Sequence, residues 1–180
     1  MKKIISLLFA LSIGLCGQAF AYSKTFDDFA DVGAIGVPLV AGVITLAKDD
    51  DDGLWQLGQS YLVTMGATYG LKQAIHSTRP DGSDNDSFPS GHASSAFAGA
   101  SYLQFRYGWK YGVPGYLVAS AVAWSRVDSD HHHWRDVIAS AALANVSAYF
   151  LTERFEKKVA VIPLVEPGAG AYGLMAAVRF

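Results

Sequence analysis

The sequence predicts an all-α protein, an up-and-down bundle of about five core helices followed by a short C-terminal β-hairpin. Three observations lead to this expectation. Hydrophobic residues make up 51% of the 180 residues and charged residues only 17%, which is typical of a very apolar soluble helical domain or a small membrane protein. Apolar stretches recur at lengths suited to helices rather than strands. The length allows one domain with a sizeable core.

The first 21 residues have the three-part pattern of a secretory signal peptide. Residues 2–3 are basic, residues 4–15 are apolar, and Ala19 and Ala21 place small side chains where a signal peptidase cleaves. The apolar run is too short to span a bilayer, which takes about 20 residues. We therefore expect cleavage after Ala21 and export from the cytoplasm. The single cysteine, Cys16, would leave with the signal.

A helical domain is expected over residues 22–158. Proline, glycine and acidic runs mark its loops. The run Asp49–Asp52 lacks the spaced ligands and the distal glutamate of a calcium loop, so we interpret it as a solvated turn. Pro38 predicts a kink in the first helix. The expected helices are Asp31–Ala47, Leu54–Lys72, Ser90–Tyr107, Val113–Ser125 and Trp134–Phe155.

Residues 159–180 are expected to form a β-hairpin tail. Two β-prone stretches, Val159–Val165 and Ala171–Phe180, flank a segment that contains Pro167 and two glycines. Two strands alone are marginally stable in water. We therefore expect this hairpin to cover part of the bundle.

Three groups of polar residues are expected to meet at one end of the bundle. The chain of an up-and-down bundle reverses at each loop. The end of the second helix, the start of the third, the end of the fourth and the start of the fifth therefore lie together. The groups at these positions are Lys72 with Arg79-Pro80, then Pro89-Ser90-Gly91-His92, and then Ser125-Arg126 with His132 and Asp136.

The cations and the helix start in these groups suit the binding of phosphate. Lys72, Arg79 and Arg126 offer three cations with many donors for phosphate oxygens. Ser90 and Gly91 stand at a helix start, where free backbone N–H groups and the helix dipole favour an anion. Together they predict an anion site.

Two histidines supply reactive groups for this site. His92 and His132 can act as proton donor and nucleophile near neutral pH. Asp136 lies four residues after His132, so on a helical turn the carboxylate can hold one ring nitrogen protonated. The reaction class that uses these parts is metal-free phosphoryl transfer through a phosphohistidine. No metal and no cofactor are expected.

The same residues resemble the signature of the type 2 phosphatidic acid phosphatase superfamily. The matching segments are Lys72-x6-Arg79-Pro80, Pro89-Ser90-Gly91-His92 and Ser125-Arg126-x5-His132-x3-Asp136. The resemblance covers about residues 54–150. It implies that His132 is the nucleophile, that Asp136 orients it, and that His92 protonates the leaving oxygen. It also implies that phosphate oxygens are bound by Lys72, Arg79, Ser90, Gly91 and Arg126.

Several functions stay open at this point. The first is a metal-independent phosphatase for lipid phosphates or pyrophosphates, such as phosphatidic acid, phosphatidylglycerol phosphate, undecaprenyl pyrophosphate or lipid A. The second is a soluble periplasmic acid phosphatase of broad specificity, and the third is an inactive module that binds anions or lipids. The formal net charge of −2 gives no basic excess for nucleic acid. No obligate protein partner is evident.

The pattern favours embedding in a membrane. The helices are rich in small residues, which suits close packing in lipid. Trp55 and Trp109 are expected at the far end of the bundle, and Trp124 and Trp134 at the site end, as in two interfacial belts. Polar residues in the second helix, such as Gln56, leave a soluble bundle open. We expect the site to face the periplasm, with the bundle in or on the bacterial inner membrane.

Overall fold

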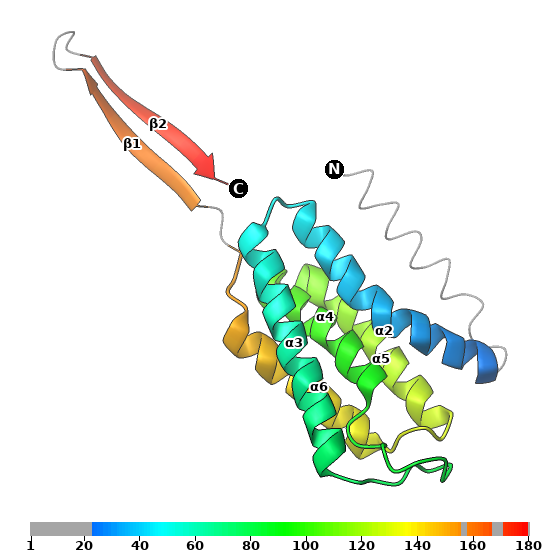
Figure 1. Ribbon diagram of the computed structural model, residues 1–180. Helices are drawn as coiled ribbons and strands as arrows, with labels where there is room; N and C mark the ends of the chain where they lie inside the picture. The colour runs from blue at the N-terminus through cyan, green and yellow to red at the C-terminus, as the bar shows by residue number, and fades with distance from the viewer. Residues whose placement is uncertain (1–22, 156–157, 167–170, 180) are drawn as a thin grey trace.

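The computed structural model describes residues 23–155, 158–166 and 171–179, so the expected signal peptide lies outside the described residues. Figure 1 shows a bundle of long helices and a separate hairpin. The all-α prediction is confirmed. The described helices are α2 (Ser23–Leu46), α3 (Asp51–Ala74), α4 (Gly91–Tyr107), α5 (Trp109–Asp128) and α6 (Trp134–Leu151).

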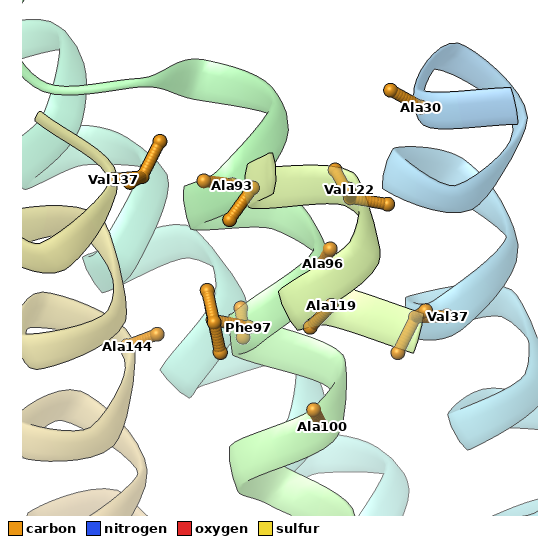
Figure 2. Close-up of a cluster of buried hydrophobic side chains, with 12 residues drawn as sticks. Ala30, Val37, Ala93, Ala96, Phe97, Ala100, Ala119, Val122, Val137 and Ala144 are labelled. Atoms are coloured by element: carbon orange, nitrogen blue, oxygen red, sulfur yellow. The ribbon is translucent and has the colours of Figure 1, made fainter. Parts of the chain in front are cut away.

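Helix α4 is the centre of the bundle and contacts each of the other four helices. Most of its side chains are small and buried. Figure 2 shows Ala96 and Phe97 of α4 lying between Val37 of α2 and Ala144 of α6, with Ala119 of α5 beside them. Small residues let helix backbones approach closely, so the core is built on short distances between helices rather than on large side chains.

Helices α2 and α4 approach each other closely at Gly99 of α4. A Cβ atom added there would lie 2.7 Å from the backbone nitrogen of Pro38 in α2. No real Cβ tolerates this distance to a backbone atom, so one of the two helices would have to move.

We therefore expect Gly99→Ala to lower the free energy of unfolding by about 2 kcal/mol, the usual cost of overpacking a core. Thermal unfolding measures this change. Gly66→Ala in α3 is the matched control, because an added Cβ there meets nothing within 4 Å. The control should gain about 0.5–1 kcal/mol from the better helix propensity of alanine. Equal stability of the two variants would contradict the close contact between α2 and α4.

Helix α2 begins at Ser23, well before the expected start at Asp31. Its first turns pack on the end of α5, where the Ser125 hydroxyl donates to the carbonyl of Phe26 at 2.7 Å. Helix α5 also begins early, at Trp109 rather than Val113. Gly108 adopts a φ of 79° and reverses the chain in a single residue.

Helix α6 ends at Leu151 and not at Phe155 as expected. The residues that follow it leave the helix to bind α4. The N–H of Phe155 donates to the carbonyl of Arg106 at 2.8 Å, and Arg106 Nη1 donates to the carbonyl of Glu153 at 2.9 Å. These long-range bonds replace the last turn that the apolar pattern predicts.

A buried ion pair closes the end of the bundle opposite the predicted site. Asp50 caps α3 and accepts a hydrogen bond from the N–H of Gly53 at 3.0 Å. Its carboxylate also pairs with Arg106, whose Nε donates to Oδ2 at 2.8 Å and whose Nη2 donates to Oδ1. The Tyr107 hydroxyl donates to the same Oδ2 at 2.6 Å. The expectation of a solvated turn is therefore wrong for Asp50, whereas Asp51 is exposed.

The C-terminal residues form the expected hairpin of β1 (Lys158–Glu166) and β2 (Ala171–Arg179). The strands are antiparallel, with Lys158 opposite Arg179 and Glu166 opposite Ala171. Among the described residues neither strand contacts a helix, and Figure 1 shows the hairpin pointing away from the bundle. The expectation that the hairpin covers the bundle is not met. The backbone hydrogen bonds of the hairpin are formed between its own two strands.

Candidate active site

The structure brings the three predicted groups of polar residues to one end of the bundle. The loop from α3 to α4 and the loop from α5 to α6 lie side by side there (Figure 1). The N–H of Asp81 in the first loop donates to the carbonyl of Asp130 in the second at 3.1 Å. The Ser140 hydroxyl of α6 donates to the carbonyl of Ser90 at 2.9 Å. Chain reversal in an up-and-down bundle therefore places the groups as expected.

His132 is held with one ring nitrogen occupied. The residue is 4% exposed, and its Nδ1 lies 2.6 Å from the carbonyl oxygen of Ser87. A carbonyl can only accept a hydrogen bond, so Nδ1 carries the hydrogen and Nε2 keeps the lone pair. The backbone N–H of His132 donates to the carbonyl of Arg126 at 3.0 Å, which fixes the loop. This arrangement leaves Nε2 with a free lone pair.

Asp136 lies beside His132 but does not form the expected direct hydrogen bond. Its Oδ2 is 3.8 Å from Nδ1, and it accepts instead from the Ser87 hydroxyl at 2.5 Å and from the N–H of His133 at 2.8 Å. Asp136 is the third residue of α6 and fully buried, so its carboxylate caps the start of that helix. Ser87 therefore connects the two residues, because its carbonyl holds the His132 ring and its hydroxyl binds Asp136. Sequence reasoning missed Ser87, because a backbone carbonyl acceptor leaves no signal in the residue type.

Burial, together with the nearby charges of Lys72 and Arg79, lowers the pKa of His132 to about 4. The hydrogen bond to Ser87 and the charge of Asp136 oppose this shift. The ring is therefore unprotonated at neutral pH.

The lowered pKa predicts how activity and stability depend on pH. As pH falls from 7, kcat/KM should persist well below the ordinary histidine pKa of about 6.5 and lose its unprotonated nucleophile only near about 4. Stability should be complete above about 6.5 and decrease between about 6.5 and 4, because the unfolded chain binds the proton first. Initial rates and thermal unfolding across this range measure both. An acid limb at the ordinary value in wild type would contradict the buried, unprotonated ring.

The two cations of the first group lie along the loop from α3 to α4. Lys72 Nζ donates to the carbonyl of Asp86, and Arg79 Nε donates to Asp84 Oδ1 at 2.7 Å. Both influence His132 electrostatically, so they stand close to its ring. The salt bridge of Arg79 with Asp84 is partly exposed and therefore weak, and Arg79 can exchange it for a more highly charged anion.

The start of α4 is arranged as a helix N-terminus that can bind an anion. Ser90 is fully buried, and its Oγ caps the helix by accepting from the N–H of Ala93 at 3.4 Å. A Cβ added at Gly91 would meet nothing within 4 Å. This position therefore borders open space, which leaves room for a phosphate group at the positive end of the helix dipole.

Helix α2 adds two carboxylates that sequence reasoning missed. Arg126 is buried and pairs with Asp27 Oδ1 through Nη2. Asp31 Oδ1 lies 3.0 Å from His92 Nε2 and 3.6 Å from Arg126 Nη1. The expected first helix began at Asp31, so its first turns and their contacts with α5 were not foreseen. The spacing of Asp27 and Asp31 by one helical turn is the one signal that could have indicated a shared face.

A hollow of about 770 Å³ opens beside the phosphate-binding residues. Its lining combines apolar and cationic side chains, and it shares Arg79 with the site. The lining residues that matter below are Ile75, His76, Pro80, Phe88, His133 and Arg135. Within the described part of the chain, no group of three or more His, Cys, Asp or Glu residues could hold a metal ion.

A helical bundle that gathers three cations, a helix N-terminus and two histidines at one end defines an anion-binding class of protein suited to phosphate chemistry. The profile of the PAP2 superfamily matches residues 53–160. The chain belongs to the PAP2 superfamily.

Relatives of known activity and a solved structure are similar to this chain. The lipid A 4'-phosphatase of Helicobacter pylori is 34% identical over 133 residues, which are 68% of this chain and 67% of the relative. The lipid A 1-phosphatase of Porphyromonas gingivalis is 30% identical over 145 residues, 77% of this chain but only 27% of the relative. The crystal structure of Aquifex aeolicus LpxE has the same fold, with a TM-score of 0.61 at 19% identity over 71% of this chain and 83% of that one.

Proposed function

We propose that this protein is a metal-independent phosphatase that removes phosphate from phosphorylated lipids through a phosphohistidine intermediate. The observation that carries this proposal is the state of His132, which is buried, unprotonated and tied by Nδ1 to the Ser87 carbonyl. Its free Nε2 stands among cations that can bind the oxygens of a phosphate.

The first step transfers the phosphoryl group to the enzyme. Lys72, Arg79 and Arg126 bind the phosphate oxygens, together with the N-terminus of α4. His132 Nε2 attacks phosphorus, the bond from phosphorus to the leaving oxygen breaks, and the electron pair stays with that oxygen. His92 donates a proton to the same oxygen.

The second step returns the enzyme to its starting state. A water oxygen attacks phosphorus and gives its proton to His92, which is now neutral. The bond from phosphorus to His132 breaks, and its electron pair returns to Nε2. The hydrogen bond from Nδ1 to Ser87 stabilises the positive charge that His132 carries between the two steps, and Asp136 supports Ser87 through its hydroxyl.

The surface of the bundle supports a lipid environment. Large hydrophobic side chains are exposed on all four outer helices, and none is exposed on α4. Exposed apolar side chains on every outer helix are unusual for a soluble monomer when they form large patches, and they support contact with a membrane. Helix α2 is the one described helix that is long and apolar enough, over Thr25–Leu46, to cross a membrane by itself. The exposed residues include Leu39, Val43, Leu62, Val63, Leu117, Ile138, Val146 and Phe150.

Exposed tryptophans mark both ends of this apolar surface. Trp55 and Trp109 begin α3 and α5 at the end away from the site, and Trp124 and Trp134 lie at the site end. Tryptophan prefers the two interfaces of a bilayer. The bundle would therefore sit in the inner membrane with the site at the periplasmic interface, as the expected signal peptide implies.

The hollow beside Arg79 supports an amphiphilic substrate. Ile75, Pro80 and Phe88 give it an apolar wall, and Arg135 and His133 add polar groups. A phosphorylated lipid carries a charged, polar headgroup next to apolar acyl chains, so it could contact both the polar and the apolar parts of this lining. Relatives that act on lipid A support the same class of substrate.

The test is phosphate release by the detergent-purified protein in the presence of EDTA. Lipid phosphates in mixed micelles and a soluble aryl phosphate are offered side by side, with His132→Ala as the control. We expect a strong preference for lipid phosphate that the control variant lacks. Better turnover of the soluble ester would favour the acid-phosphatase alternative. Equal release by wild type and control would overturn the proposed function.

A further inference from the structure

The catalytic end of the bundle contains acidic residues that do not suit an anion site. Asp27 and Asp31 of α2 both lie within ion-pair distance of Arg126. Carboxylates repel a phosphate and neutralise a cation that should bind it. The role of each carboxylate therefore needs its own explanation.

Asp27 has a structural explanation. Its Oδ1 accepts from Arg126 Nη2 and from the Ser129 hydroxyl, and the hydroxyl of Ser125 reaches the carbonyl of Phe26. These contacts tie the start of α2 to the end of α5. Because Arg126 is buried, it requires such a counter-charge.

Asp31 does not connect α2 and α5 in the way that Asp27 does. Its side chain is 60% exposed, and its closest partner is His92, with Oδ1 3.0 Å from Nε2. Its distance to Arg126 Nη1 is longer, at 3.6 Å. A half-exposed ion pair contributes little to stability. The contact with His92 is thus the feature that Asp31 provides.

We propose that Asp31 is a positioning residue for His92, and this inference rests on the proposed function. Asp31 accepts a hydrogen bond from His92 Nε2, which fixes the ring and leaves the Nδ1 hydrogen for the oxygen of the leaving group. Burial lowers the pKa of His92, and the charge of Arg126, which faces the ring from α5, lowers it further. Asp31 opposes both effects, so more of the rings carry the proton when the bond from phosphorus to oxygen breaks.

The site then contains two histidines that are held in opposite ways. A neutral carbonyl holds Nδ1 of His132, and burial keeps this ring unprotonated as the nucleophile. A carboxylate accepts from Nε2 of His92 and opposes the lowering of the His92 pKa by burial and Arg126. The two rings therefore differ in their acceptor, a neutral carbonyl for the nucleophile and a carboxylate for the proton donor.

The chemistry of the leaving group gives a sharp test. An alkoxide that leaves from an alkyl phosphate is a strong base and needs a proton in the transition state. A nitrophenolate is a weak base and leaves without one. A defect in the proton donor therefore slows the first substrate far more than the second, whereas a general disturbance of the site slows both.

The experiment compares Asp31→Asn with wild type on a short-chain lipid phosphate and on p-nitrophenyl phosphate. We expect kcat for the lipid to fall by roughly 30-fold, less than the roughly 10²–10⁴-fold of general acid catalysis because His92 itself remains, and kcat for the aryl ester to fall far less. Asp31→Glu should restore part of the lipid activity. Asp28→Asn is the matched control, since Asp28 is exposed on the same helix, and it should behave as wild type.

The outcomes separate the inference from the function on which it rests. Equal losses on both substrates, or no loss on the lipid, would overturn the role of Asp31. If His132→Ala were as active as wild type, the proposed function itself would fail, whatever Asp31→Asn does. Thermal unfolding of each variant identifies a loss that arises from misfolding, and in that case the comparison rests on Asp31→Glu.

Discussion

Replacing His132 with alanine is expected to abolish phosphate release, with a loss of about 10⁴-fold or more in kcat, the usual effect of removing a nucleophile. The reason is that the variant has no nitrogen on which the phosphoryl group can be carried. Wild type quenched in base during turnover should retain phosphate on the protein, because a phosphorylated imidazole survives base. The alanine variant should retain none. Labelled substrate and a rapid quench measure both quantities.

His133 provides the control for this result. It is the next residue along the chain, and its Nε2 lies 3.2 Å from the carbonyl of Thr78. The N–H through which it binds Asp136 is a backbone group that alanine keeps. His133→Ala should therefore retain the phosphoenzyme. Phosphate that stays on the protein in His132→Ala would place the nucleophile elsewhere.

Replacing Asp50 with alanine is expected to lower the free energy of unfolding by about 3–5 kcal/mol, as for other broken buried ion pairs. Arg106 would then be left buried without its counter-charge, since the side chains of Asp50 and Arg106 are 3% and 7% exposed. Thermal unfolding in detergent measures the effect. The folded fraction should keep its kcat, because the pair lies at the end of the bundle opposite the site.

Two further variants show what the ion pair contributes. Asp52→Ala removes an exposed carboxylate in the first turn of the same helix, and it should cost less than about 1 kcal/mol through the helix dipole. The double variant Asp50→Leu with Arg106→Met removes both charges and should be more stable than Asp50→Ala, since no charge is left unpaired. Wild-type stability in Asp50→Ala would contradict the importance of the buried pair.

The position of the site could be predicted because it depends only on the reversal of the chain at each loop. Lys72, Ser90, Arg126 and Asp136 stand at helix ends that an up-and-down topology must place together. Apolar stretches of helical length located all five helices. The ends of the helices were less predictable. Gly108 reverses the chain in one residue, and Phe155 leaves α6 for a hydrogen bond on α4.

The sequence by itself determined the helical class, the convergence of the three motifs and the chemistry that their residue types allow. Tertiary structure decided how those residues are held. In the structure, Nδ1 of His132 contacts the Ser87 carbonyl and does not hydrogen-bond Asp136. Asp31 contacts His92, and Asp50 is buried although it belongs to an acidic run. Each of these contacts joins residues 45 or more positions apart or uses a backbone atom, so neither periodicity nor residue type carries a signal for it.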